Sequence, residues 1–558
     1  MEIMTVSDVL LKVLAAQGVR HLFGIPGDAI NDVMDAVRRQ DDIEFILMRH
    51  EEAGAFAASA QAKLTGRLAA CVGTAGPGAI HLLNGLYDAR LDHAPVIAIT
   101  GQIATGFIGT QYHQEVNLER LFADVAVYSQ TVMTADQVPD VFLEACHAAI
   151  THRGVAHVSI PTDISGRSAS FGGMRHMTAS MPAPVSPATA DCDNAVKMIN
   201  QAERIAILAG IGCVDAHEEL IAFAEVLRAP IIRTLKAKEV IDDNHPLCIG
   251  GLGLLGGRPA VKAMDQCDLL IMVGSDFPYH DFFPHDVRSI QIDIQPTQIG
   301  KRHPIDIGLV GHAKPTLAKL ARLVDTQRPA TFLESMQQEM QQMLEQQREL
   351  ERSDDVPISP PRVLHTLGRL APEDSIFLCD TGTVTAWAAR HLRLRPGQRF
   401  ALSGGLASMA FAFSGAIGAQ LAYPDRRVFA LAGDGAFAML MGDFVTAVKY
   451  DLPIVVVVLN NAKLAFITLE QEAKGLPDWG TDLTNPDFAA IARACGGVGF
   501  SVDSPEQLET VMRDALAARK PALIDIVVNP DTLILPPDIK LSQTIHFGLA
   551  KLREFFGT

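Results

Sequence analysis

Short apolar runs alternate with helical patterns along almost the whole chain, and many of the runs end in glycine, aspartate or asparagine. Examples are PVIAITG at 95–101, DLLIMVGSD at 268–276 and PIVVVVLNN at 453–461, and EEAGAFAASAQAKL at 51–64 has a helical pattern. Strands that alternate with helices form parallel sheets with helices packed on both faces. The chain is therefore predicted to be an α/β protein built from doubly wound parallel sheets.

The apolar runs fall into three sets separated by two linkers. A Pro/Ala/Ser-rich stretch at 179–190 follows the first set. A Gln/Glu-rich segment at 334–353, predicted to be a surface helix, leads into a proline-rich stretch at 355–362. A chain of 558 residues is long enough for about three to four domains. We expect three α/β domains and a tail, with the limits 1–178, 190–325, 358–530 and 531–558.

Composition argues against several classes of protein. The net charge is −17 and no dense run of Lys and Arg occurs, so neither nucleic acid nor an anionic membrane surface is an expected partner. The eight cysteines include no Cys-x-x-Cys pair, which favours a reducing compartment. No apolar run reaches about 18 residues, the length of a membrane-spanning helix. We predict a cytoplasmic protein and leave open a peripheral contact with the inner face of the membrane.

A single carboxylate interrupts one of the most apolar stretches. Asp434 lies between two glycines directly after the run at 428–432, and the strand predicted at 453–459 ends in Asn460 and Asn461. Ligands of parallel sheets bind where the carboxyl ends of the strands converge. A carboxylate and an amide oxygen there suit Mg²⁺, which completes its coordination with phosphate oxygens. The alternative is that Asp434 is only the N-cap of a helix.

The segment GDGAFAMLMGDFVTAVKYDLPIVVVVLNN resembles the Gly-Asp-Gly…Asn-Asn signature of thiamine-diphosphate enzymes. The resemblance implies that Asp434, Asn461 and the backbone carbonyl of Lys463 bind the metal. It also places Gly433, Gly435 and Asn460 beside the diphosphate. Motifs similar to the family's N-terminal domain occur earlier in the chain, among them FGIPGD, RHEE and GTAGPG.

The resemblance covers nearly the whole chain, and the subgroup it is most similar to is the pyruvate oxidases, including the quinone-reducing pyruvate dehydrogenase. It implies an N-terminal domain that binds the thiamine pyrimidine, a central domain that binds FAD and a C-terminal domain that binds the diphosphate and Mg²⁺. A dimer is the smallest active unit in this family, and a homotetramer is expected.

In the family, a glutamate hydrogen-bonded to the pyrimidine assists loss of the thiazolium proton. Glu51, directly after Arg-His in RHEE, matches that position, although two acids at 51 and 52 could simply favour a helix N-terminus. Met409 in GLASMAF matches the apolar wedge beneath the cofactor, and the carbonyl of Ala407 would accept from the aminopyrimidine. Thr381 and Gly382 are expected at the diphosphate or the pyrimidine, or form an ordinary turn.

The substrate loop departs from the family pattern. Where relatives have Phe-Gln-Glu, this chain has QYHQE at 111–115. Gln114 is retained and could hold a substrate carboxylate. His113 replaces the aromatic wall with a titratable ring, or is a packed neutral histidine.

FAD is expected from three segments rather than from a Rossmann fingerprint. LAGIGC at 208–213 fails as Gly-x-Gly-x-x-Gly because residue 215 is Asp. Segments of GGLGLLGG, VGSDFPY and QIDIQP resemble the flavin-contacting segments of the oxidases, and Phe466 and Ile467 match residues between flavin and thiazolium. The expected flavin contacts are Leu252, Gly253, Leu254, Leu255, Ser275, Asp276, Phe277, Pro278 and Asp293.

The expected function is oxidative decarboxylation of a 2-oxo acid, with pyruvate giving acetate or acetyl phosphate and CO₂, and with electrons passing through FAD to quinone or O₂. An acetolactate synthase-like carboligase, or a non-oxidative decarboxylase with structural FAD, is the alternative. A catalytically silent cofactor-binding protein is a third. The final FGLAKLREFFGT offers one short apolar-basic turn, a poor membrane anchor.

Overall fold

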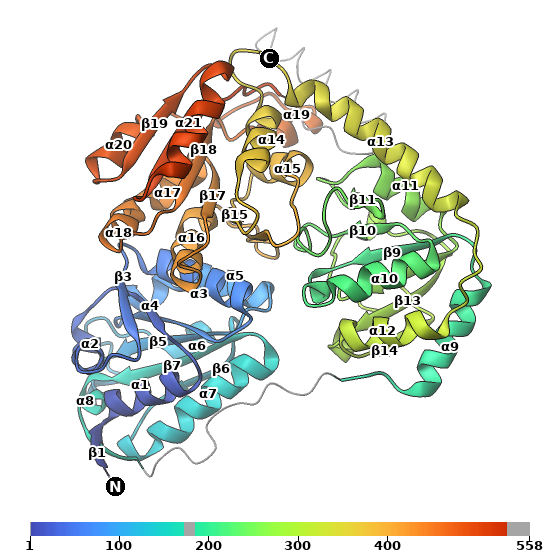
Figure 1. The fold of residues 1–558 in the computed structure, drawn as a ribbon. Coiled ribbons are helices and arrows are strands. Elements are labelled where there is room, and N and C mark those ends of the chain that lie inside the picture. The colour runs from blue at the N-terminus through green and yellow to red at the C-terminus, as the bar shows by residue number, and fades with distance from the viewer. Residues whose placement is uncertain (1, 172–184, 533–558) are drawn as a thin grey trace.

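The computed structural model describes residues 2–171 and 185–532, and in them the chain forms three domains, each built on a six-stranded, wholly parallel sheet (Figure 1). Helices cover both faces of each sheet. In the first domain, for example, Val96 and Ala98 belong to one apolar cluster, whereas Ile97 and Ile99 belong to another on the opposite face. The predicted α/β fold class is confirmed. Most of the tail 531–558 and part of the linker 179–190 lie outside the described residues.

The first domain also carries a small antiparallel sheet made by β1 (Glu2–Thr5) and β8 (Ser168–Phe171). The main sheet has the spatial order β3 (Glu44–Leu47), β2 (His21–Gly24), β4 (Ala69–Gly73), β5 (Val96–Gln102), β7 (Val155–Pro161) and β6 (Ala126–Thr131). Its helices are α1 (Val6–Ala16), α2 (Asn31–Arg38), α3 (Glu51–Thr65), α4 (Pro77–His81), α5 (Leu83–Leu91), α6 (Leu118–Phe122), α7 (Val138–His152) and α8 (Thr162–Ser165), with 3₁₀ turns η1 (Asp28–Ile30), η2 (Thr105–Phe107) and η3 (Ala135–Gln137).

The central domain has the spatial strand order β11 (Cys248–Gly251), β10 (Ile231–Arg233), β9 (Ile205–Ala209), β12 (Leu269–Val273), β13 (Arg288–Asp293) and β14 (Ile307–Val310). Its helices are α9 (Thr189–Gln201), α10 (His217–Leu227), α11 (Arg258–Gln266) and α12 (Ala313–Leu323), with 3₁₀ turns η4 (Ile211–Cys213), η5 (His280–Phe282) and η6 (Pro296–Gln298). The long helix α13 (Thr331–Glu351) then leads to the third domain.

The third domain has the spatial strand order β16 (Arg399–Leu402), β15 (Ile376–Cys379), β17 (Val428–Gly433), β18 (Val455–Asn460), β20 (Ala522–Val527) and β19 (Val498–Val502). Its helices are α14 (Pro360–Leu370), α15 (Thr383–His391), α16 (Phe411–Ala422), α17 (Asp434–Leu440), α18 (Phe444–Lys449), α19 (Ala465–Ala473), α20 (Phe488–Ala494) and α21 (Pro505–Ala517), with the 3₁₀ turn η7 (Met441–Asp443).

Some strands of the three large sheets were not predicted from apolar runs, and each of these lies at the edge of its sheet. Edge strands are covered by fewer neighbours, so they need fewer apolar side chains. Most residues of β6, β14 and β19 are accordingly only partly buried. The strands missed in this way are β6, β11, β14, β16 and β19.

The first and third domains share one apolar core, in which α3 and α16 pack side by side (Figure 1). Small residues allow a close approach: a Cβ on Gly418 would lie 2.1 Å from the carbonyl oxygen of Ala57, and one on Gly415 would lie 2.9 Å from the Cβ of Ala60. The carboxyl ends of the two sheets are therefore held in a defined relation to one another.

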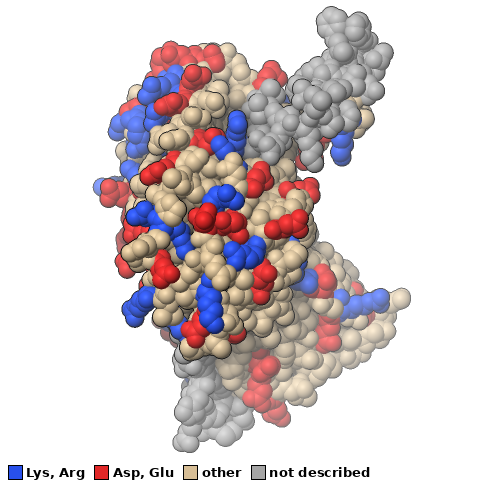
Figure 2. All heavy atoms as spheres, turned by 90° about the vertical axis from the view of Figure 1, so that its right-hand side faces the viewer, with Lys and Arg blue, Asp and Glu red and all other residues tan. Residues whose placement is uncertain are grey.

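The outer face of the central domain and of α13 is turned toward the viewer in Figure 2, where basic and acidic side chains are intermixed. This face carries no continuous basic surface among the described residues. The predicted surface helix is α13, but it is not wholly exposed, because Met336 is buried against the central domain. Within 2–171 and 185–532, no helix combines the length and apolarity needed to cross a membrane.

Candidate active site

Asp434 is the first residue of α17, directly after β17, and its side chain is almost fully buried. Gly433 with extended backbone is the N-cap, so Asp434 is not a simple capping residue. Burial raises the pKa of the Asp434 carboxyl, while a hydrogen bond from Asn485 and others from nearby backbone N–H groups oppose that rise. A buried carboxylate at a strand end, without a basic partner in the described residues, suits a cation.

Asn485 links the carboxyl ends of β17 and β18. Its Nδ2 donates to Oδ2 of Asp434 at 2.6 Å and to Oδ1 of Asn460 at 3.0 Å. Asn460 ends β18, which pairs in parallel with β17, and its own Nδ2 donates to Asp525 at 3.0 Å. The sequence reasoning missed Asn485, because Asn-Pro ordinarily marks only a turn.

Asn461 and Lys463 follow directly in the same turn. The Asn461 Oδ1 accepts from the backbone N–H of Lys463 at 3.1 Å. The Lys463 side chain is turned away to bind Asp478, which leaves the backbone of this turn as its contribution to a metal site. The carboxylate of Asp434, the amide of Asn461 and the carbonyl of Lys463 are hard oxygen donors of the kind Mg²⁺ prefers.

Other residues predicted to bind the cofactor gather at the same edge of the third sheet. A Cβ on Gly435 would lie 3.5 Å from Cε of Met409, so Met409 reaches the Gly-Asp-Gly turn. Ala407 adopts a left-handed conformation (φ 60°) in the turn before α16. Thr381 and Gly382 follow β15, which is the neighbour of β17.

Glu51 begins α3 and is 7% exposed. One carboxylate oxygen lies 3.0 Å from Nδ1 of His81, and the ring of His81 packs against that of His50 with centroids 4.5 Å apart. The other oxygen faces Gly78, where a Cβ would lie 3.1 Å away. His81 was not predicted, because its position 30 residues along the chain from Glu51 forms no local pattern.

The first domain approaches the third near this site. Asn84 donates to Glu52 at 2.6 Å and to the Ser408 hydroxyl at 3.0 Å, beside Met409. Among the described residues, no hydrogen bond or ion pair joins Glu51 to Asp434. The contact between Asn84 and Ser408 therefore places the start of α5 beside the turn that precedes α16, at the boundary between the first and third domains.

The predicted substrate loop lies beside Glu51's turn. Gln114 has φ 61° and packs against Gly76, two residues from the Gly78 that faces Glu51. His113 is exposed, and no described contact involves it. The structure thus brings Gln114 to the turn at Gly76–Gly78 that Glu51 also faces, and no such contact is described for His113.

Phe466 and Ile467 lie in the first turn of α19, directly after the Lys463 turn. Ile467 is 45% exposed. A single exposed apolar side chain is common on protein surfaces, so the place of Ile467 beside the flavin stays a prediction.

The predicted flavin segments follow β11 and β12 and end β13, so they share the carboxyl edge of the central sheet. The ring of Phe277 lies 3.1 Å from the place a Cβ on Gly253 would occupy. Lys236, which was not predicted, binds Asp276 at 2.6 Å. Burial raises the pKa of the Asp293 carboxyl.

The other predicted flavin residues lie in the same turns. Leu252 is buried, whereas Leu254 is 48% exposed. The hydroxyl of Ser275 accepts from the backbone N–H of Phe277 at 3.3 Å. Leu255 and Pro278 complete these two turns. Glycine-rich turns after β11 and β12, with the buried carboxylate of Asp293 on the strand beyond β12, fit an extended dinucleotide.

The fold and this site define a class of α/β proteins that gather oxygen donors suited to a metal ion at the carboxyl edge of a parallel sheet. Three models from one known protein family match the chain, one in each domain. Residues 4–121, 192–320 and 380–526 match the N-terminal TPP binding domain, the central domain and the C-terminal TPP binding domain of thiamine pyrophosphate enzymes.

Several relatives match nearly full length. A putative thiamine pyrophosphate-containing protein, YdaP, of Bacillus subtilis is 40% identical (99% of this chain, 96% of the relative), and the pyruvate oxidase of Lactiplantibacillus plantarum is 37% identical (96% and 90%). The acetolactate synthase large subunit of Corynebacterium glutamicum is 32% identical (100% and 92%). The chain belongs to the thiamine pyrophosphate enzyme family, in a group close to pyruvate oxidase.

Proposed function

We propose that this enzyme carries out the oxidative decarboxylation of pyruvate with thiamine diphosphate, Mg²⁺ and FAD, giving acetate or acetyl phosphate and CO₂. The observation that carries the oxidative part is the gathering of the three flavin segments at one edge of the central sheet, with Lys236 bound to Asp276 beside them. The similarity to a pyruvate oxidase over nearly the whole chain supports this choice. Quinone or O₂ is the proposed electron acceptor.

When bound, thiamine diphosphate would supply a nucleophile for the 2-oxo acid and FAD would supply a two-electron acceptor. Glu51 holds the proton that it shares with the pyrimidine ring of the cofactor, and His81 orients the carboxyl group through its second oxygen. Asp434, Asn461 and the Lys463 carbonyl hold the metal, and Asn485 holds Asp434 in place.

Other residues shape the space around the cofactor. Gly433, Gly435 and Asn460 would line the diphosphate, and Thr381 and Gly382 would contact the diphosphate or the pyrimidine. Met409 would be the apolar support of the cofactor, and the Ala407 carbonyl would accept from its aminopyrimidine. Gln114 binds the substrate carboxylate, His113 faces the substrate entrance, and Phe466 and Ile467 lie between the two cofactors. Each of these assignments rests on motif position together with the placement of its turn at a sheet edge.

The proposed assembly is a homotetramer whose smallest active unit is a dimer. This proposal rests on the resemblance to the thiamine-diphosphate enzymes, in which the cofactor lies between the N-terminal domain of one subunit and the C-terminal domain of its partner. We propose the limits 1–178, 190–325 and 358–530 for the pyrimidine-, FAD- and diphosphate-binding domains, and the three sheets lie within these ranges.

The test is to mix the purified protein anaerobically with pyruvate, thiamine diphosphate and Mg²⁺ while following the visible flavin absorbance and CO₂. Rapid bleaching together with CO₂ release supports oxidation through FAD. CO₂ release with an unbleached flavin overturns it in favour of a carboligase or simple decarboxylase, and the product, acetolactate or acetaldehyde, tells these two apart. If neither bleaching nor CO₂ appears, pyruvate is not the substrate.

A further inference from the structure

Two histidine side chains lie next to the carboxylate of Glu51. His81, the last residue of α4, has its Nδ1 3.0 Å from Oε2 of Glu51, and the ring centroids of His50 and His81 are 4.5 Å apart. One nitrogen of each histidine and one oxygen of Glu51 all lie within 4.8 Å of one another. Within 2–171 and 185–532, no other three His, Cys, Asp or Glu side chains gather this closely.

The start of α3 presents two of these three side chains. His50 is the N-cap of α3 and Glu51 is its first residue. The Nδ1 of His50 accepts a hydrogen bond from the backbone N–H of Glu52 at 3.2 Å, so this nitrogen carries no proton. An imidazole nitrogen without a proton is the form that binds a metal ion, and His50 can exchange this one neutral hydrogen bond for a metal.

The charge around the cluster favours a cation. Oε2 of Glu52 lies 3.9 Å from Nδ1 of His50, and among the described residues neither Glu51 nor Glu52 forms an ion pair with a lysine or an arginine. With neutral histidines the cluster is therefore negative, and a bound cation would offset that charge. The side chains of His50 and His81 are 39% and 43% exposed in this chain, so an ion can reach the cluster from the histidine side.

The types of ligand select the metal. Two imidazoles and one carboxylate are a donor set of open zinc sites, in which water completes a tetrahedron and the ligand atoms lie about 3.3 Å apart. Rotation of the two partly exposed histidine side chains can bring the cluster to that spacing. Mg²⁺ prefers oxygen donors alone, as at Asp434 and Asn461. The chain therefore offers two sets of ligands with different metal preferences.

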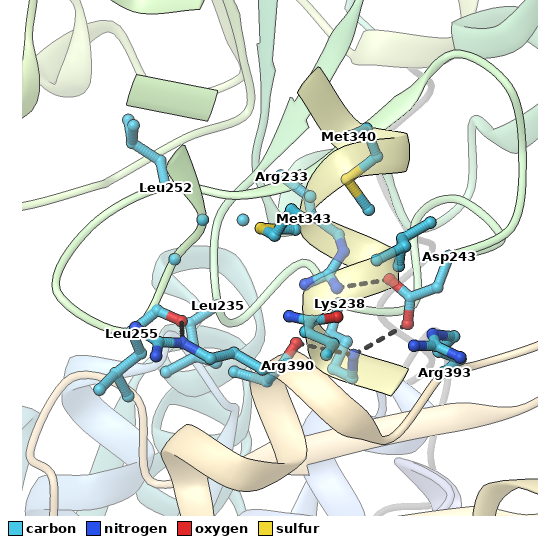
Figure 3. Close-up of a pocket in the computed structure, with 17 residues that line it drawn as sticks. Arg233, Leu235, Lys238, Asp243, Leu252, Leu255, Met340, Met343, Arg390 and Arg393 are labelled. Atoms are coloured by element: carbon cyan, nitrogen blue, oxygen red, sulfur yellow. Dashed lines mark hydrogen bonds and ion pairs between the residues drawn. The ribbon is translucent and has the colours of Figure 1, made fainter. Parts of the chain in front are cut away.

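The cavity shown in Figure 3, of about 50 Å³ between the loop after β11 and α13, offers no comparable site. Its lining carboxylate is that of Asp243, which binds the side chains of Arg233 and Lys238, the latter at 2.8 Å. Basic side chains on a carboxylate repel a further cation. The carboxylates beside His50 have imidazole partners instead.

We propose that His50, Glu51 and His81 bind Zn²⁺, with water as the fourth ligand, and that Zn²⁺ held there competes with thiamine diphosphate. The competition rests on the proposed function, in which Glu51 shares a proton with the pyrimidine ring of the cofactor. A carboxylate oxygen bound to zinc cannot take part in that exchange. Zn²⁺ is then an inhibitor that acts at the predicted catalytic glutamate rather than at the Mg²⁺ ligands.

The experiment is equilibrium dialysis of Zn²⁺ against the protein as purified, in excess Mg²⁺ and without substrate, followed by metal analysis of both compartments. Excess Mg²⁺ keeps Zn²⁺ from the oxygen donors at Asp434. A second series adds increasing thiamine diphosphate.

Two variants each remove one imidazole. His50→Asn keeps a side-chain acceptor at the N-cap of α3, and His81→Gln keeps a hydrogen-bonding group beside Glu51. The matched control is His312→Asn, because His312 caps α12 in the same way, with its Nδ1 accepting from a backbone N–H at 3.3 Å. Melting temperatures identify a variant that folds poorly, and the other histidine variant then serves.

We expect saturable Zn²⁺ binding to the parent and the control, weaker by about tenfold or more in either histidine variant, since even loss of a residue that only orients a ligand costs this much. Thiamine diphosphate should weaken Zn²⁺ binding to the parent as its concentration rises. Only the component lost in the variants counts in favour of the site.

No saturable binding in excess Mg²⁺, or equal binding by the parent and both histidine variants, would overturn the site. Binding that thiamine diphosphate leaves unchanged would overturn the competition. Because the dialysis contains no substrate, failure of the chain to oxidise pyruvate would contradict the proposed function alone and leave the zinc measurement intact.

Discussion

Asp380 and Asp434 follow neighbouring strands of the third sheet, and burial raises the pKa of both carboxyl groups. Their surroundings differ. Asp434 receives a side-chain hydrogen bond from Asn485. Asp380 is wholly buried, accepts from the backbone N–H of Ala412 at 2.8 Å and has its second oxygen without a partner in the described residues. Asp434 is therefore placed for a ligand, whereas Asp380 is a cost to stability whenever it is ionised.

Asp380 predicts a pH dependence of stability. Its folded pKa of about 7 lies above the ordinary value of 3.8. The folded state thus binds the proton more tightly, and stability falls as the pH rises from about 4 through 7, by at most about 4 kcal/mol. We expect Asp380→Asn to raise the melting temperature at pH 8 and much less at pH 5. Thermal unfolding across this range checks it, with the exposed Asp374→Asn as control, and an equal shift at both pH values would contradict it.

The Glu51–His81 pair makes a second prediction at this scale. Glu51→Gln is expected to lower kcat by about 10²–10⁴-fold, because the carboxyl can no longer exchange a proton. His81→Ala should lower kcat by about tenfold while leaving thiamine diphosphate binding almost unchanged, since His81 only orients Glu51. CO₂ release and cofactor titration measure the two effects. The matched control is Glu52→Gln, and if Glu52→Gln proves as damaging as Glu51→Gln, the assignment fails.

At the scale of the element, the segment after α19 holds in place the turn that carries the proposed metal ligands Asn461 and Lys463. The backbone N–H of Leu464 donates to Thr481 and that of Leu483 donates to Ala462, both at 2.8 Å, and Asn485 completes the clamp at Asp434. The ends of β17 and β18 are thereby kept together by a stretch that contains no residue of the predicted site.

We expect Asn485→Ala to raise the Mg²⁺ concentration needed for half-maximal activity by about 10–100-fold, as loss of a residue that orients a metal ligand does. The same shift should appear when Mg²⁺-dependent cofactor binding is followed by protein fluorescence, without substrate. Thr484→Ala, next to Asn485 but with an exposed side chain, should leave both curves in place. If Asn485→Ala leaves the Mg²⁺ concentration for half-maximal activity unchanged, Asn485 does not orient Asp434 for metal binding.

The packing of α3 on α16 carries the other prediction for an element. In Gly418→Ala the new methyl group would meet the Ala57 carbonyl at 2.1 Å, so the helices must separate. Overpacking of this kind costs about 1–3 kcal/mol. Thermal melting should show the loss, while Gly442→Ala, which meets nothing within 4 Å, should not. Equal melting temperatures for the two variants would mean that α3 and α16 can move apart at little cost in stability.

For the whole molecule, the proposed intersubunit site predicts complementation. Glu51→Gln and Asp434→Asn should each be inactive alone, yet a mixed dimer would hold one site with both residues intact. The mixed dimer should therefore have about half of the parent activity, because one of its two sites is intact. Co-expression with two different affinity tags, followed by a CO₂ assay of the doubly purified protein, measures this. If the mixed dimer forms but stays inactive, Glu51 and Asp434 serve the same site within one chain.

Periodicity in the sequence by itself determined the fold class, because a buried parallel strand has to be apolar on both faces and to end in a turn. The same pattern placed Asp434 and Asn461 at strand ends, whereas the choice of Glu51 came from the resemblance to the thiamine-diphosphate enzymes. Edge strands such as β6 and β19 were not predicted, because partly buried strands do not need a continuous run of apolar side chains.

Only the tertiary structure decided which distant residues meet. His81 reaches Glu51 through the packing of α4 on α3, Asn485 reaches Asp434 across 51 positions, and Arg390 faces the loop of another domain. None of these pairs has a spacing that a helix or strand period would reveal. Contacts between separate elements depend on how the elements pack, and that is settled by the whole core rather than by any one segment.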